Sequence, residues 1–172
     1  HAHRVAPDEA GVARHVLARQ RPLHASGSAC EVAEGVGYRA NLVGQLLTTE
    51  WASFADLPAD IVKGAVVISG LGDLEPVRLS FRNEHLALDR AAVIAASLLH
   101  RQPTARCPLL VAVGAGETDD YKRQTREVAA YWQSHGNRAE LFELAGRHHF
   151  DSVLEWADPH SALFRATLAM IK

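Results

Sequence analysis

Two stretches in the last third of the chain place acid–base side chains directly after apolar runs. The run 108–113 is followed by a glycine-rich loop and Glu117, and the run 139–144 is followed closely by His149. A carboxylate that orients an imidazole, and an imidazole that takes a proton from a hydroxyl, are two members of a catalytic triad. The acid precedes the base along the chain. This arrangement therefore indicates a hydrolase with an activated nucleophile.

Each assignment has a simpler alternative. Glu117, with Asp119 and Asp120, could belong to the start of a helix, where carboxylates favour the positive end of the helix dipole. Asp119 is the second candidate for the acid. His149 follows His148, and the alternative is a surface histidine pair. Adjacent side chains on a regular element point in different directions, so we expect only one of the two histidines to face the site.

The nucleophile is harder to assign. A serine nucleophile of this kind stands on a sharp strand-to-helix turn in the pattern G-x-S-x-G, and the chain contains no such motif. Ser28 comes nearest, because Gly27 and Ala29 flank it, but Cys30 stands where a glycine is usual. The alternatives are a plain Gly/Ser turn and a thiol nucleophile at Cys30.

Two further groups could carry chemistry. Asp73 follows the apolar run 63–69 and could act as an alternative acid, but we expect it to cap the turn that follows. The cysteines are not paired at ligand spacing and the sequence lacks His-Glu-x-x-His, so we expect no metal site.

The elements that must position these residues alternate along the chain. Continuous apolar runs are typical of parallel strands buried on both faces, and strands are predicted over 63–69, 108–113 and 139–144, the last at a sheet edge. A short strand is also predicted at Leu23–Ser26, while Glu31–Arg39 has no clear period. Helical patterns cover 41–51, 90–99, 118–135 and 160–171, with Asp89 as an N-cap and Gly136 as a terminator. This alternation predicts a parallel sheet with helices on both faces.

Composition limits the class of protein. With 172 residues, 48% hydrophobic and 22% charged, the chain is expected to form one soluble globular domain over 1–172. The net charge of -2 and the lack of a basic block argue against nucleic-acid binding. No apolar run reaches the roughly 18 residues that span a membrane, and the start of the chain lacks a signal-peptide core. Two cysteines, Cys30 and Cys107, are too few for a disulfide framework, which favours the cytoplasm.

From Leu42 onward the chain resembles the kynurenine formamidase-like (arylformamidase-like) esterases of the α/β-hydrolase fold. The matching segments are 41–51, 65–76, 109–114, 117–124 and 147–150. The resemblance implies a three-layer α/β/α sandwich with a mostly parallel sheet. It also implies that Glu117 is the acid and that His149, directly before Phe150, is the base.

Two departures from the family pattern concern the nucleophile end. Nothing matches the N-terminal His-Gly-Gly segment that supplies oxyanion-hole amides, so the N-terminal strands are expected to be missing and the domain truncated. The family's nucleophile turn runs straight into the helix that matches 41–51, whereas Glu31–Arg39 separates Ser28 from that helix. Aligned without a gap, Gly37 falls at the serine position and the nucleophile is absent; we prefer the gapped alignment with Ser28.

The resemblance implies a serine hydrolase that acts on small-molecule carboxylic esters or on aryl formamides such as N-formylkynurenine. Ser28 would attack the carbonyl, His149 would take and return the proton, and Glu117 would orient His149, without a metal or an organic cofactor. The alternative is a catalytically inactive hydrolase-like domain with a binding or structural role. The exposed edge of a truncated sheet could also pair with a second copy to form a homodimer.

Overall fold

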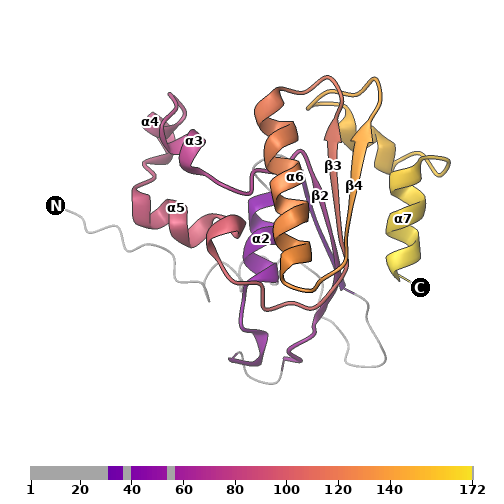
Figure 1. Cartoon of the computed structure of the whole chain (residues 1–172), viewed down its shortest axis with the longest axis horizontal. Coiled ribbons are helices and arrows are strands. Elements are labelled where there is room, and N and C mark those ends of the chain that lie inside the picture. The colour runs from indigo at the N-terminus through magenta and orange to yellow at the C-terminus, as the bar shows by residue number, and fades with distance from the viewer. Residues whose placement is uncertain (1–30, 37–39, 54–56, 172) are drawn as a thin grey trace.

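The computed structural model describes residues 31–36, 40–53 and 57–171. Within them, four strands form one sheet in which all neighbours are parallel (Figure 1). Their spatial order follows the chain: β1 (Glu31–Val36), β2 (Val62–Ile68), β3 (Leu109–Gly114) and β4 (Ala139–Leu144). The three strands predicted from apolar runs are confirmed to within one residue, and β4 lies at an edge as expected.

Helices connect the strands. They are α2 (Ala40–Leu47), α3 (Glu75–Arg78), α4 (Asn83–Leu86), α5 (Arg90–Ala96), α6 (Asp119–Ser134) and α7 (Ala162–Ile171). Short 3-10 turns occupy Trp51–Ser53, Leu98–His100 and Ser152–Trp156. The Asp89 side chain accepts a hydrogen bond from the Ala92 N–H at 2.7 Å, so the predicted N-cap is confirmed. Gly136, with φ of 78°, ends α6 as predicted.

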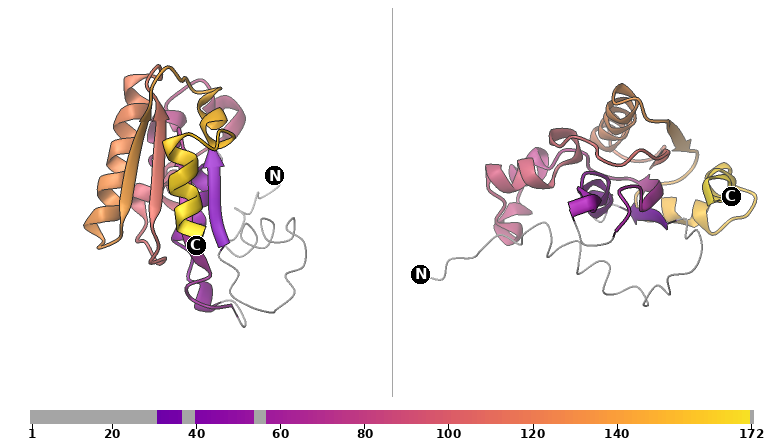
Figure 2. Two further views of the ribbon diagram at one scale, coloured as in Figure 1. Left: turned by 90° about the vertical axis from the view of Figure 1, so that its right-hand side faces the viewer. Right: turned by 90° about the horizontal axis from the view of Figure 1, so that it is seen from below.

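Alternating residues of the central strands supply two apolar layers. On one face, Ala65 and Val67 of β2 belong to the core that includes residues of α2 and α6. On the other, Val66 and Ile68 pack in a core with Leu163 of α7. Figure 2 shows α6 and α7 on opposite sides of the sheet. Both faces of β2 and β3 are buried, which explains their continuous apolar runs.

Residues Glu31–Val36, the described part of the segment Glu31–Arg39, differ from the expectation. The segment was expected to intervene as an aperiodic insertion before the helix, but Glu31–Val36 is strand β1, paired in parallel with β2 through Val36 and Ile68. Its sequence, EVAEGV, carries two glutamates and a glycine, so pairing with β2 decided its conformation rather than its own propensity. The strand predicted at Leu23–Ser26 lies outside the described residues.

Two predicted helices are shorter than expected. The helix expected to reach residue 51 ends at Leu47, and the Thr48 and Thr49 hydroxyls donate to the Gly44 and Gln45 carbonyls. Side-chain bonds of this kind compete with further helical turns. The helix expected to reach residue 99 ends at Ala96 and continues as a 3-10 turn.

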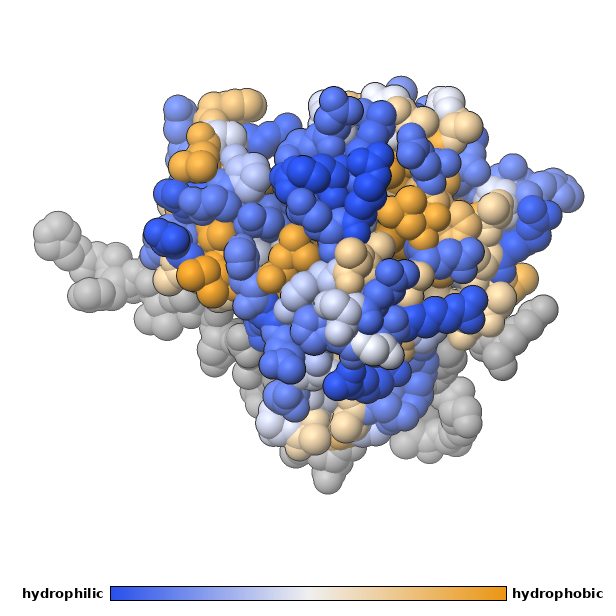
Figure 3. All heavy atoms as spheres, in the orientation of Figure 1, coloured by the Kyte–Doolittle hydropathy of each residue, from blue (hydrophilic) through white to orange (hydrophobic). Residues whose placement is uncertain are grey.

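The long connection between β2 and α5 carries exposed apolar side chains. Leu79, Phe81 and Leu86 lie in and between α3 and α4, and Phe81 is 76% exposed. Figure 3 shows apolar surface at this upper-left corner, next to the polar surface over α6. Across the described ranges, the helices are too short or too polar to cross a bilayer.

Candidate active site

The carboxyl ends of β2, β3 and β4 lie side by side. Ile68 pairs with Ala112, and Gly114 pairs with Leu144, so the residues that follow these strands share one edge of the sheet. Polar groups gather beyond this edge in parallel α/β sheets. Here Ser69 follows β2, Glu117 follows β3, and His149 follows β4.

Glu117 and His149 are brought together at this edge. Nδ1 of His149 lies 2.9 Å from Oε2 of Glu117. The Glu117 side chain is 1% exposed and that of His149 is 30% exposed. An ionised carboxylate can only accept hydrogen bonds, so Nδ1 carries the proton of this pair. In the neutral ring, Nε2 is then the nitrogen that can accept a proton.

The loop after β3 turns the Glu117 side chain back onto the strand end. The Glu117 N–H donates to the Gly114 carbonyl at 3.0 Å, and the Gly114 N–H donates to Glu117 Oε1 at 2.8 Å. The Ser69 hydroxyl donates to the same oxygen. The Gly114 N–H, the Ser69 hydroxyl and His149 Nδ1 thus contact the two oxygens of this carboxylate. A buried charged group needs such hydrogen-bond partners.

Two aromatic rings flank His149. The Tyr121 ring lies 4.8 Å from the imidazole, centroid to centroid, and the Phe150 ring lies 5.4 Å away at a near right angle. Burial raises the pKa of the Tyr121 hydroxyl, so it stays protonated at neutral pH. Phe150 is 86% exposed. The partly exposed imidazole therefore adjoins an exposed apolar ring.

The competing candidates have other positions. His148 is exposed, and its Nδ1 lies 3.4 Å from Asp151 Oδ1, so only one of the two adjacent histidines contacts Glu117. Asp119 is exposed as the first residue of α6. Asp73 accepts a hydrogen bond from the Glu75 N–H at 2.9 Å, so it caps the turn as predicted. Asp73 also lies 3.2 Å from His100 Nε2.

The predicted nucleophile cannot be located in the same way. Ser28 and Cys30 lie outside the described residues. Cys107 is buried before β3, and burial raises the pKa of its thiol to about 11, which keeps it in the unreactive thiol form. No group of three or more metal-ligating side chains gathers within the described ranges.

Sequence reasoning assigned no role to Ser69 and Ser152, which also belong to this cluster. Ser69 ends the apolar run of β2 and is followed by Gly70. A hydroxyl residue directly after a buried strand is the sequence signal that could have identified it. Ser152 follows His149 by three residues and is fully buried. Its proximity to Ser69, 3.3 Å between the two hydroxyl oxygens, depends on tertiary packing alone.

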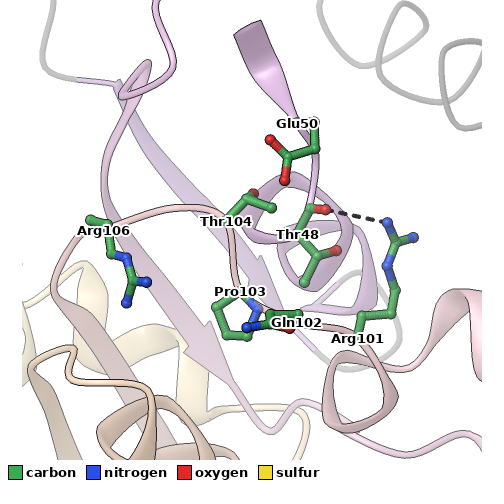
Figure 4. Close-up of a pocket in the computed structure, with 7 residues that line it drawn as sticks. All are labelled: Thr48, Glu50, Arg101, Gln102, Pro103, Thr104 and Arg106. Carbon is green, nitrogen blue, oxygen red and sulfur yellow. Dashed lines mark hydrogen bonds between the residues drawn. The ribbon is translucent and has the colours of Figure 1, made fainter. Parts of the chain in front are cut away.

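An open pocket of about 600 Å³ lies at the other end of the sheet (Figure 4). It is formed by residues after α2 and before β3, and an Arg101 N–H donates to the Thr48 carbonyl across it at 3.3 Å. Its lining is Thr48, Glu50, Arg101, Gln102, Pro103, Thr104 and Arg106. Because it adjoins the amino end of β3, it is separate from the Glu117–His149 pair.

Gly114 allows the β3 loop and the His149 loop to approach closely. A Cβ at this position would lie 2.6 Å from the Arg147 carbonyl oxygen and 3.0 Å from His148 Cα. Both are backbone atoms and cannot rotate away. We therefore expect Gly114→Ala to displace the loop that carries His149 and to lower the free energy of unfolding by about 1–3 kcal/mol, measured by urea denaturation.

Gly116→Ala is the matched control for Gly114→Ala. Its Cβ would lie 3.1 Å from the same carbonyl oxygen, a contact that a small shift relieves. Equal stability of the two variants would contradict the close approach at Gly114.

Comparisons with known proteins agree with this fold. No family model matches the chain. Kynurenine formamidase from Danio rerio is 25% identical over 137 residues, which cover 77% of this chain and 46% of that protein. Kynurenine formamidase from Salmo salar is 24% identical over 138 residues, with the same coverage of 77% and 46%. The chain thus spans about half the length of these relatives.

Solved structures extend the comparison. A protein of Silicibacter sp. tm1040, described as a candidate thioesterase, superposes with a TM-score of 0.73 at 25% identity, covering 95% of this chain and 56% of that one. Esterase 2 of Thermogutta terrifontis superposes with a TM-score of 0.54 at 18% identity, covering 82% and 56%. The second likeness concerns the fold alone.

The parallel sheet, the helices on both its faces and these structural relatives define a partial α/β-hydrolase fold. Within that superfamily, the sequence is similar to kynurenine formamidases, at 24–25% identity over about three quarters of this chain.

Proposed function

We propose that the Glu117–His149 pair is the acid–base half of a serine hydrolase site. The observation that carries this proposal is the 2.9 Å contact between the buried carboxylate and Nδ1 of a partly exposed imidazole. This contact selects the tautomer in which Nε2 can take a proton from a nucleophile and return it to the leaving group. The names of the sequence relatives and the esterase-like neighbours support hydrolysis as the reaction class.

The proposed substrates are carboxylic esters or aryl formamides such as N-formylkynurenine. In the proposed mechanism, the Ser28 hydroxyl attacks the carbonyl carbon while His149 Nε2 accepts its proton. His149 then protonates the leaving alcohol or amine. In the second half, water attacks the acyl or formyl carbon while His149 accepts the water proton, and the return of that proton to the Ser28 oxygen releases the acid. Glu117 orients the imidazole throughout.

A second candidate function, a catalytically inactive hydrolase-like domain, has its own support. β1 ends at Val36 and α2 begins at Ala40, so the strand-to-helix connection is Gly37-Tyr-Arg39 and contains no serine. The strand conformation of Glu31–Val36 supports this candidate, because it fits the ungapped alignment in which Gly37 stands at the serine position.

The position of Ser28 along the chain favours the second candidate. Ser28 precedes Glu31, where β1 begins, whereas the acid and base follow the carboxyl ends of β3 and β4. Three residues span at most about 11 Å, which is less than the length of β1 at about 3.3 Å per residue. In this candidate, the Glu117–His149 pair belongs to a binding or structural site.

Labelling with a fluorophosphonate separates the two candidates. If Ser28 is the nucleophile, the wild-type chain is labelled and hydrolyses p-nitrophenyl acetate, and Ser28→Ala loses both properties. Labelling and hydrolysis that are equal in both proteins would remove Ser28 from the mechanism. No labelling and no hydrolysis of p-nitrophenyl acetate or N-formylkynurenine by either protein would support the inactive domain.

A further inference from the structure

Ser69 occupies an unusual backbone position at the end of β2. It is fully buried and has φ of 52°, a left-handed conformation that only Ser69 and Ala87 share among the non-glycine residues of the described ranges. This conformation is unfavourable for a residue with a Cβ. The Ser69 N–H nevertheless donates to the Ala112 carbonyl at 2.7 Å. The surrounding structure therefore holds a serine where a glycine would be less strained.

The Ser69 hydroxyl connects three loops at the site. Its one proton goes to Glu117 Oε1, because a carboxylate can only accept. Its oxygen lies 3.3 Å from the Ser152 hydroxyl, which in turn lies 3.4 Å from the His149 carbonyl oxygen. Ser152 has one proton, which can go either to the Ser69 oxygen or to the His149 carbonyl oxygen, so Ser152 lies between the His149 loop and the hydroxyl that binds the carboxylate.

The Ser69 hydroxyl fixes the carboxylate from the side opposite to His149. Oε1 receives the Ser69 hydroxyl and the Gly114 N–H, which leaves Oε2 for His149 Nδ1. Without the hydroxyl, a single backbone donor would hold Oε1. The carboxylate could then rotate about its last torsion, which is a broad energy well.

We propose that Ser69 is a positioning residue for Glu117, holding the carboxylate in the orientation that binds Nδ1 of His149. An effect of Ser69 on the rate of hydrolysis rests on the proposed function, but its effect on the orientation of the His149 ring does not. Ser69 does not touch the reacting atoms and acts through Glu117. If Ser69 had a purely structural role, it would only complete the backbone hydrogen bonding at the end of β2 and would not affect the orientation of Glu117.

Two substitutions separate the hydroxyl from the backbone strain. Ser69→Ala removes the hydroxyl and keeps the Cβ at φ of 52°, whereas Ser69→Gly removes the hydroxyl and relieves the strain. Ser97→Ala is the matched control. Ser97 is equally buried, and its Oγ accepts a hydrogen bond from the Leu74 N–H, away from the carboxylate.

The first readout is the NMR spectrum of the His149 ring, assigned with His149→Gln. We expect the low-field Nδ1 proton signal in the wild type and in Ser97→Ala, and its loss or exchange broadening in both Ser69 variants. Retention of the signal in Ser69→Gly would overturn the proposal, because the fold would then orient Glu117 without the hydroxyl. This readout needs no catalytic activity.

The second readout is kinetic and applies if the wild type hydrolyses p-nitrophenyl acetate. We expect both Ser69 variants to lower kcat by about 10- to 100-fold, the range for a hydrogen bond to a charged group, with KM unchanged. A fall in kcat for Ser69→Ala alone would assign the effect to strain and contradict the proposal. An inactive wild type with the expected NMR result would reject the proposed function and keep the positioning role.

Discussion

Replacing His149 with alanine is expected to lower kcat/KM for p-nitrophenyl acetate by about 100- to 10,000-fold, the usual contribution of a positioned general base. The reason is the 2.9 Å contact with Glu117, which directs the basic nitrogen, Nε2, away from the carboxylate. Steady-state hydrolysis at neutral pH measures the loss. Glu117→Gln should also reduce activity, because the amide can donate to Nδ1 and favour the wrong tautomer.

His148→Ala is the control for this prediction. His148 stands next to His149, but its Nδ1 accepts a hydrogen bond from the Phe150 N–H at 3.2 Å, whereas it is His149 that contacts Glu117. We expect this variant to keep wild-type activity within about 2-fold, in line with an exposed side chain outside the site. An equal loss in His148→Ala and His149→Ala would contradict the assignment of His149 as the base.

Replacing Gly37 with serine is expected to produce the largest gain in reactivity if the chain lacks a nucleophile. The new hydroxyl would stand in the connection between β1 and α2, where a serine hydrolase of this fold carries its nucleophile. We expect fluorophosphonate labelling to rise by about 100-fold or more, because general-base activation of a hydroxyl contributes 100- to 10,000-fold. Labelling suits this test better than turnover, which also needs oxyanion donors.

Two further variants make the Gly37 experiment specific. Gly37→Ala adds a Cβ without a hydroxyl and should remain unlabelled. Gly37→Ser combined with His149→Ala should lose the gain, because the new hydroxyl would have no base. Labelling of the double variant at the level of Gly37→Ser would show that the serine reacts independently of the Glu117–His149 pair. An unlabelled Gly37→Ser variant that unfolds like the wild type would contradict the placement of the nucleophile position at Gly37.

The strand at 108–113 could be predicted from the sequence because its environment is uniform. β3 is buried on both faces, so its composition directly reflects its position in the sheet. Parallel strands in alternation with helices place their carboxyl ends at one edge of the sheet. This rule alone predicts that Glu117 and His149 lie close together. The loop that carries Glu117 has little conformational freedom, because β3 ends at Gly114 and α6 begins at Asp119.

Strand β1 illustrates the limit of such reasoning. Glu31–Val36 lacks both a continuous apolar run and an alternating pattern, and its strand conformation depends on backbone hydrogen bonds to β2, a segment about thirty residues away in sequence. No local signal reports such bonds. The assignment of Ser28 as the nucleophile, which treats this segment as an insertion, stays a prediction.

The amino-acid sequence by itself determined the alternation of strands and helices from β2 onward, the loops that bear the acid and the base, and the absence of a G-x-S-x-G motif, because these depend on residue type and local spacing. Tertiary structure alone decided which carboxylate meets which imidazole, that Ser69 and Ser152 extend this contact, and that β1 leads into α2. Hydrogen bonds between residues 32 to 83 positions apart depend on how the sheet aligns its strand ends. That alignment is a property of the packed molecule as a whole.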